Sequence, residues 1–302
     1  MKYDYIIVGA GSAGCVIANR LSEDPSTQVL LIEAGGSDRR FFIQMPIGYG
    51  VTYHQKAVNW MYMTEPSPDA DNKPSYWPRG KVMGGSSSIN AMVYVRGNSR
   101  DFDQWSEAGN PGWSYSDVLP YFKKMESWQN GPDDYRGGDG PLNVSEVSEQ
   151  LHPLCQNFLS AAQEIGIGLN KDMNGATQEG VGNYQITTHK GQRMSSSRAY
   201  LWPIIGRTNL TIIKNAQATK ILTQDKKAFG IEYKKSGKIH QAIAKCEVIL
   251  SAGSINSPHL LQLSGIGPKN ALNKASIPLV HDSPGVGENL QDHVGVSYFY
   301  KS

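Results

Sequence analysis

The sequence has few cysteines, no long apolar run and almost no net charge. Its three cysteines, Cys15, Cys155 and Cys246, are widely spaced and form no C-x-x-C pair, which excludes a disulfide framework and a cysteine zinc site. No apolar stretch approaches the roughly 20 residues of a membrane-spanning helix, so no transmembrane segment is predicted. The formal net charge of +2 gives no general attraction to nucleic acid.

Signals for secretion, metal binding and hydrolase chemistry are also missing. Residues 1–4 lead directly into a short apolar strand, without the apolar core and cleavage site of a signal peptide. None of the seven histidines has a metal-ligand spacing, and there is no G-x-S-x-G elbow, so no metal is predicted. Together with the unpaired cysteines, these absences predict a cytoplasmic compartment.

Glycine, in contrast, is abundant: 32 of the 302 residues are glycine, and they cluster beside apolar runs. The first cluster, at 9–14, follows the apolar run 5–8 and opens the segment 12–22, whose apolar residues have helical spacing. A second buried strand is predicted at 29–32, and Glu33 ends it. A G-x-G-x-x-G in this strand–helix–strand context, with an acid further on, is the dinucleotide-binding fingerprint.

The residues of this fingerprint have distinct predicted roles. Gly9 makes the tight turn, Gly11 lets a pyrophosphate approach the backbone, and Gly14 lets helix and strand pack closely. The helix N-terminus favours the diphosphate, and Glu33 accepts hydrogen bonds from the ribose hydroxyls. The predicted cofactor-binding residues of this unit are Gly9, Gly11, Ser12, Ala13, Gly14, Glu33 and Ala34. The fingerprint itself does not separate NAD from FAD.

The hydrophobic pattern changes to a period of two between residues 210 and 250. Successive antiparallel strands are predicted at 210–213, 218–222, 228–233 and 238–244. Turns are expected at 225–227 and 235–238. A separate buried strand at 248–250 then leads into a helix from about 257 to 263.

Three further motifs resemble one known family. Residues 80–97, GKVMGGSSSINAMVYVRG, resemble the first signature of the glucose–methanol–choline (GMC) flavin oxidoreductases. Residues 253–267, GSINSPHLLQLSGIG, fit the second signature, and residues 285–293, GVGENLQDH, are also typical of the family. In this order the motifs make the chain similar to choline dehydrogenase-like bacterial members of the GMC family, and the resemblance implies FAD as the cofactor.

The resemblance also implies which residues meet the FAD. The flavin-side residues are Val82, Gly84, Gly85, Ser86, Asn90, Ala91, Met92 and Val93. Family members with a covalent flavin have a histidine directly before this asparagine; Ile89 stands there, so non-covalent FAD is expected. Ala218 replaces a family valine that contacts the adenine side through its backbone. Ala252 and Gly253 complete the predicted set.

The family reaction is the oxidation of a primary alcohol to an aldehyde. Hydride passes to flavin N5 while a histidine takes the hydroxyl proton. In the family that histidine comes much later in the chain, so this chain is expected to be a truncated, N-terminal portion that is inactive alone, with its catalytic residue expected C-terminal to Ser302. His293 is a weaker candidate base, and a structural role is favoured for it.

The expected partners are a small primary alcohol and an electron acceptor, either O2 or a quinone of the respiratory chain. A membrane-bound acceptor would allow peripheral association with a membrane. An incomplete sheet is expected to expose apolar surface and promote self-association. Three alternatives stay open: a non-catalytic flavin-binding fragment, an NAD-dependent dehydrogenase, and a lyase that keeps FAD in a structural role.

The predicted fold class is α/β. A Rossmann-like FAD-binding domain with an inserted antiparallel β-meander is joined to a partial substrate-binding domain. The FAD-binding domain is expected to be discontinuous, over residues 1–37, 76–105 and 190–302. Residues 38–75 are expected to form a connecting or lid segment, and residues 106–189 a partial substrate or cap domain.

Overall fold

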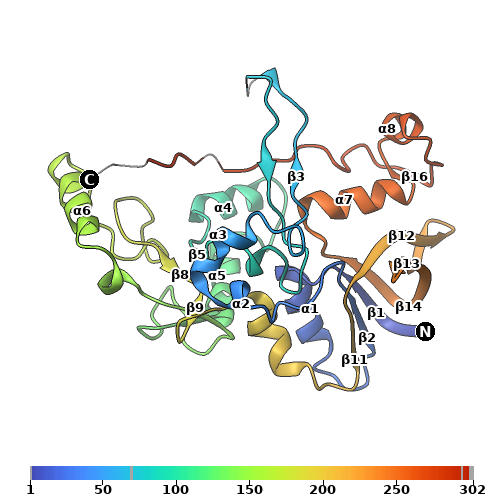
Figure 1. Ribbon diagram of the computed structural model, residues 1–302, viewed down its shortest axis with the longest axis horizontal. Coiled ribbons are helices and arrows are strands. Elements are labelled where there is room, and N and C mark those ends of the chain that lie inside the picture. The colour runs from blue at the N-terminus through green and yellow to red at the C-terminus, as the bar shows by residue number, and fades with distance from the viewer. Residues whose placement is uncertain (1, 69–70, 294, 299–302) are drawn as a thin grey trace.

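The computed structural model describes residues 2–68, 71–293 and 295–298, and its largest sheet is a six-stranded mixed sheet, at the right in Figure 1. The strand order is β11-β2-β1-β14-β13-β12. The bounds are β1 Lys2–Val8, β2 Val29–Ile32, β11 Leu210–Ile213, β12 Ala216–Gln224, β13 Lys227–Lys235 and β14 Lys238–Leu250. Three strand pairs are parallel: β11 with β2, β2 with β1, and β1 with the end of β14. Two pairs are antiparallel: β12 with β13, and β13 with the start of β14.

The long strand β14 joins the two halves of this sheet. Its residues 238–243 pair antiparallel with β13, and its residues 243–250 pair in parallel with β1. The prediction of separate strands at 238–244 and 248–250 is therefore wrong. The antiparallel prediction for 210–213 is also wrong, because β11 pairs in parallel with β2. Side-chain alternation reports which face is buried and carries no information on strand direction.

The two turns of the meander agree with the prediction. Asp225 and Lys226 have φ values of 51° and 63°, and Ser236 and Gly237 have values of 49° and 78°. Positive φ at both central residues is the backbone of a type I′ turn, which matches the right-handed twist of the flanking strands. The predicted antiparallel β-meander is therefore confirmed as β12-β13-β14.

Helices cover both faces of the parallel half. On β1, Ile6 and Val8 face the core cluster that contains Leu260 of α7 (Gly253–Leu263). The intervening Ile7 faces the opposite cluster, which contains Ala18 of α1 (Ser12–Leu21). This alternation produces the helix–sheet–helix layers of an α/β fold, as predicted. The helix α7 begins at Gly253, earlier than expected, and contains Pro258 in its first half.

The remaining chain forms short elements around this core (Figure 1). The helices are α2 Phe41–Gln44, α3 Tyr49–Thr52, α4 Ser99–Glu107, α5 Tyr115–Met125, α6 Leu154–Glu164 and α8 Lys269–Lys274. The paired short strands are β3 Tyr62–Met63 with β4 Tyr76–Trp77, β5 Val93–Tyr94 with β8 Gln185–Ile186, β6 Glu126–Trp128 with β7 Leu142–Val144, β9 Thr188–His189 with β10 Gln192–Arg193, and β15 Ile266–Gly267 with β16 His281–Asp282. Capping boxes start α4 and α5.

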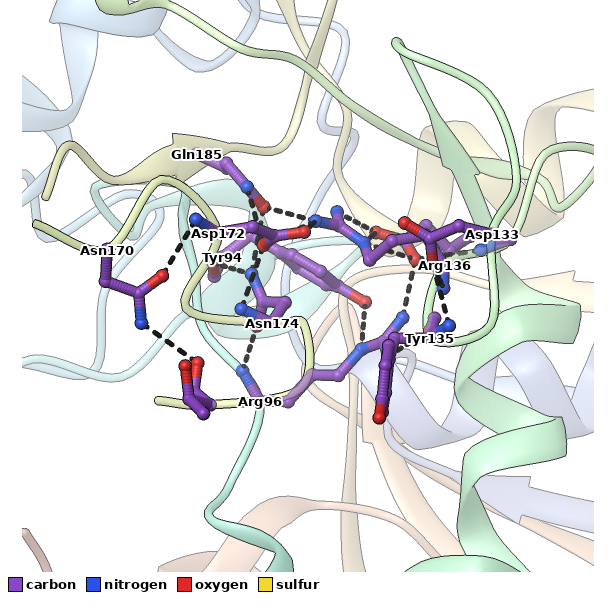
Figure 2. Close-up of polar contacts among 12 residues, drawn as sticks. Tyr94, Arg96, Asp133, Tyr135, Arg136, Asn170, Asp172, Asn174 and Gln185 are labelled. Carbon is purple, nitrogen blue, oxygen red and sulfur yellow. Dashed lines mark hydrogen bonds and ion pairs between the residues drawn. The ribbon is translucent and has the colours of Figure 1, made fainter. Parts of the chain in front are cut away.

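A buried charge network holds residues 94–185 together (Figure 2). Arg136 pairs with Glu126 and places its Nη1 2.9 Å from both carboxylate oxygens of Asp172. Arg96 pairs with the other oxygen of Glu126, and the Arg136 guanidinium lies 4.1 Å from the ring centre of Trp128. Two positive and two negative charges therefore compensate one another in a region with few buried apolar residues.

Candidate functional site

A cavity of about 750 Å³ lies at the carboxyl ends of the parallel strands. The last residues of β1, β2 and β14, which are Val8, Ile32 and Leu250, all line it. The first residues of α1 and α7 line it as well. In open α/β sheets this edge is where ligands bind, because loops and helix N-termini converge there.

The first glycine cluster shapes one wall of the cavity through close backbone packing. Gly9 has φ +98°, and a Cβ there would lie 2.7 Å from the carbonyl oxygen of Ser251. A Cβ on Gly14 would lie 1.9 Å from the carbonyl oxygen of Gly9, so the close helix–strand approach requires glycine. At Gly11 the nearest atom would be 3.7 Å away. Packing therefore does not require glycine at Gly11, whose open side faces the cavity.

The glycine- and serine-rich segment 80–97, called here the second glycine block, packs on the first glycine cluster at 9–14. The N–H of Gly84 donates to the carbonyl oxygen of Ala10 over 2.7 Å. Gly85 has φ +55°, and a Cβ there would lie 2.7 Å from the Cα of Gly11. The two blocks are far apart in sequence, yet their backbones meet beside the cavity. The absence of a side chain at Gly85 thus lets the two loops approach closely enough to line one site.

Glu33 lies in a cradle of backbone donors at the end of β2. Its carboxylate accepts hydrogen bonds from the N–H groups of Ala10 at 2.9 Å and Gly35 at 2.8 Å. Burial raises the pKa of Glu33 to about 7, although these N–H groups favour the ionised form. The side chain is 6% exposed and lines the cavity. Each carboxylate oxygen keeps a lone pair for a further donor.

An aromatic pair borders the cavity on the side of the β3–β4 arm. The rings of Trp60 and Tyr62 stack with their centres 5.8 Å apart, and the ammonium group of Lys81 lies 4.3 Å from the Trp60 ring centre. The Tyr62 hydroxyl donates to Asn256 Oδ1 of α7 over 2.6 Å. Trp60, Tyr62 and Asn256 all line the cavity. Tyr62 lies in no motif, and the contact of Asn256 with it joins two distant segments, so neither was predicted as a site residue.

The structure brings most of the predicted cofactor residues to this one cavity. Those that line it are Gly9, Gly11, Ser12, Ala13, Glu33, Ala34, Gly85, Ser86, Ala218, Ala252 and Gly253. Those outside its lining are Gly14, Val82, Gly84, Asn90, Ala91, Met92 and Val93. Val82 is fully buried among Ile43, Val58 and Ile89. In the segment 90–93, Asn90, Ala91 and Val93 are exposed, whereas Met92 is buried.

Arg193 is a further residue that the sequence pattern did not single out. Its guanidinium donates to Asn90 Oδ1 over 2.8 Å and to the carbonyl oxygen of Ser87 over 3.1 Å. Arg193 is fully buried. No periodic pattern connects it with a segment about a hundred positions earlier, so only the tertiary structure reveals this contact.

The described residues include no evident catalytic base. His293 is exposed, lies outside the cavity lining, and its backbone N–H donates to Asp292 Oδ1. His259 on α7 does line the cavity, next to Asn256 and Leu260. Within the described part of the chain there is no cluster of His, Cys, Asp and Glu that could hold a metal ion. None of the helices described there is long and apolar enough to cross a membrane.

The fold and the motif positions are those of one family of oxidoreductases. The chain belongs to the GMC oxidoreductases, whose family profile matches residues 3–295. It is 51% identical over 299 residues to an oxygen-dependent choline dehydrogenase of Photobacterium profundum, covering 99% of this chain and 53% of that protein. It is 49% identical to an alcohol dehydrogenase [acceptor] of Pseudomonas putida, covering 98% of this chain and 54% of that protein.

Solved structures agree with this assignment. Pyridoxine 4-oxidase from Mesorbium loti superposes with a TM-score of 0.90 at 32% identity, over 93% of this chain and 55% of that chain. An FAD-dependent oxidoreductase from Chaetomium thermophilum gives a TM-score of 0.87 at 34% identity, over 94% and 51%. The chain thus spans about half the length of the curated relatives it matches.

Proposed function

We propose that this chain is the FAD-binding portion of a choline dehydrogenase-like alcohol oxidoreductase. The observation that carries the proposal is the cavity at the carboxyl ends of β1, β2 and β14, where both glycine blocks and Glu33 converge. A relative described as FAD-dependent shares this fold over nearly the whole chain. The fingerprint and the family membership together favour a flavin over a nicotinamide cofactor.

The cavity fits a dinucleotide in shape and in donor chemistry. The open side of Gly11 and the N-terminus of α1, whose first residues have no side-chain cap, would hold the diphosphate. The remaining lone pairs of Glu33 would accept the ribose hydroxyls, and the backbone at Ala218 would meet the adenine. Ile89, 5% exposed, stands where a covalently linked flavin needs a histidine, so the FAD would be held without a covalent bond.

When bound, FAD supplies the acceptor for a hydride from a primary alcohol. The chain's own residues orient the cofactor and exclude water around it. The proton acceptor is assigned to none of the described residues; the family resemblance assigns it to the part of the relatives that this chain does not span. We therefore expect the 302-residue chain alone to show no measurable turnover of choline, benzyl alcohol or hexanol in a dye-linked assay.

The proposed cofactor is tested with Gly11→Val. Its side chain would enter the space assigned to the diphosphate, so flavin retention should be lost while the far-UV circular dichroism stays unchanged. Gly14→Val is the matched control, because its side chain would collide with the Gly9 carbonyl oxygen and should lower the thermal midpoint itself. Full flavin occupancy in purified Gly11→Val would reject the assignment of this loop. Acid precipitation of the unsubstituted protein should leave the yellow colour in the supernatant.

The division into segments and the partners belong to the same proposal. Residues 1–37, 76–105 and 190–302 form the FAD-binding domain, 38–75 the lid and 106–189 the cap. A small primary alcohol is the substrate, O2 or a quinone takes the electrons, and the cytoplasm is the compartment.

Phe41 and Ile47 are 71% and 77% exposed, which supports self-association through this apolar surface. Sedimentation velocity over a range of concentrations tests that point.

A further inference from the structure

Arg193 in β10 is a buried cation without an anionic partner in the described part of the chain. It is 0% exposed, and its Nη2 is a fully buried donor with no hydrogen-bond partner there. Burial lowers the pKa of Arg193 to about 10, so the guanidinium stays charged at neutral pH. An unpaired buried charge costs free energy, and such a group in a native fold needs an explanation.

The other guanidinium nitrogens tie three segments together. Nε donates to the carbonyl oxygen of Ile43 at the end of α2 over 2.9 Å, and Nη1 donates to the carbonyl oxygen of Ser87 and to Asn90 Oδ1. Asn90 Oδ1 also accepts the N–H of Met92 over 3.1 Å. Because two donors fix this oxygen, the orientation of the Asn90 amide is determined, and the side chain can hold the following turn.

That turn has a strained backbone. Met92 has φ +64°, in the left-handed region that a long side chain rarely adopts. Its N–H is held by Asn90, and its carbonyl oxygen accepts the N–H of Thr187 over 2.9 Å. Strain of this kind persists only where the surroundings determine the conformation, and it concentrates at functional sites. Arg193 is the buried group that anchors the Asn90 end.

We propose that Arg193 is a positioning residue for the flavin: it fixes the turn Asn90–Met92 through Asn90 Oδ1 and places a positive charge behind that turn. The inference rests on the proposed function, because the turn belongs to the segment expected along the flavin ring. A fixed positive charge in a water-poor environment stabilises a ring that gains negative charge on reduction. The charge of Arg193, which has no anionic partner among the described residues, would be offset by the negative charge that the flavin gains on reduction.

The first test uses the chain loaded with FAD. Arg193→Met removes the charge and should weaken sulfite binding by flavin about tenfold, with a reduction potential lower by about 30 mV for the two-electron couple. Arg193→Lys keeps the charge and should keep most of the sulfite affinity. Arg198→Met is the matched control, because Arg198 donates to the Arg193 carbonyl oxygen and to Gln44 but contacts no residue of the turn; it should change neither value.

The second test needs no cofactor. In the FAD-free chain, hydrogen exchange at the Met92 amide should become about tenfold faster in Arg193→Met and in Arg193→Lys, because neither side chain provides the guanidinium fork. Arg198→Met should leave it unchanged. If Arg193→Met does not fold, Asn90→Ala removes the same contact from the exposed side and should reproduce the faster exchange.

The outcomes separate this inference from the proposed function. Unchanged exchange at Met92 in Arg193→Lys and in Asn90→Ala would overturn the positioning role, and equal sulfite affinity in Arg193→Met and the unsubstituted chain would overturn the electrostatic role. If the unsubstituted chain binds no FAD, the proposed function fails together with the flavin part of this inference. Exchange at Met92 would still decide whether Arg193 holds the turn.

Discussion

Two fully buried arginines lie in this molecule in opposite surroundings. Arg136 contacts two carboxylates, Glu126 and Asp172, whereas Arg193 contacts carbonyl and amide oxygens only. Burial alone would lower the pKa of Arg136, but its hydrogen bonds and charge pairing with Glu126 and Asp172 raise it. Burial without an acid lowers the pKa of Arg193. The same side chain is thus stabilised in its charged form at one place and penalised at the other.

The surroundings of Arg136 are those of a structural site, whereas the surroundings of Arg193 are those expected beside a ligand site. The network around Arg136 satisfies its charges within the protein and connects residues between 94 and 185 (Figure 2). The apolar cluster of this region is small. It replaces part of a hydrophobic core with paired charges, which stabilise only while every partner is present. Arg193, in contrast, has one donor without an acceptor, Nη2, and an unpaired positive charge, and it lies beside the strained turn Asn90–Met92. We infer that incomplete pairing beside a candidate site is more informative about function than complete pairing elsewhere.

The largest effect is expected for Arg136→Met. It leaves the buried carboxylate of Glu126 with one cation and removes the bidentate partner of Asp172, so the free energy of unfolding should fall by about 3–5 kcal/mol. Urea unfolding followed by circular dichroism measures this loss. Arg20→Met is the control, because the Arg20–Glu23 pair is exposed and should contribute nothing measurable. Equal midpoints for both variants would mean that the network does not stabilise the fold.

A smaller loss of stability is expected for Arg193→Met. The substitution leaves the oxygens of Ile43, Ser87 and Asn90 without this donor, but it also removes an unpaired charge from the interior. The two effects oppose each other, so the free energy of unfolding should fall by only about 1–2 kcal/mol. The same urea experiment gives the comparison with Arg136→Met. A loss for Arg193→Met equal to or above that for Arg136→Met would contradict the contrast drawn between the two arginines.

A pH-dependent effect is expected at another buried ionisable group, Glu33. Its pKa is raised from 4.5 to about 7 in the folded chain, so folding favours the protonated carboxyl. The stability that this contributes is fully present below pH 4.5 and is lost as the pH rises through 7. In Glu33→Gln this dependence should disappear. Urea midpoints measured across the range from about pH 5 to 8 test it.

Cofactor binding should show the opposite trend at the same residue. Ribose hydroxyls that donate to Glu33 favour its ionised form and would lower its pKa. FAD affinity should therefore increase as the pH rises toward 7 and level off above it, and Glu33→Gln should remove the increase. Quenching of FAD fluorescence on titration with protein measures the affinity. An affinity that falls as the pH approaches 7 would show that Glu33 does not accept hydrogen bonds from FAD.

Short local patterns in the sequence were enough to predict several parts of the fold. The apolar run before Gly9, the glycine spacing and the acid Glu33 defined the strand–helix–strand unit, because tight turns and close helix–strand packing require glycine at particular positions. The turns predicted at 225–227 and 235–238 also followed from short-range chemistry, although their positive φ values came from the structure. The second glycine block and the segments 253–267 and 285–293 indicated the family, and Gly80, Gly85 and Ser86 of that block line the cavity.

Tertiary structure alone decided the rest. The parallel pairing of β11 with β2, the Tyr62–Asn256 hydrogen bond and the Arg193–Asn90 contact join residues more than a hundred positions apart. Periodicity reports which side of an element is buried, and it does not report which distant element lies against that side. Whether a buried arginine contacts a carboxylate or an uncharged oxygen depends on which distant element packs against it. The contrast between Arg136 and Arg193 is therefore a property of the folded chain, although both residues were visible in the sequence.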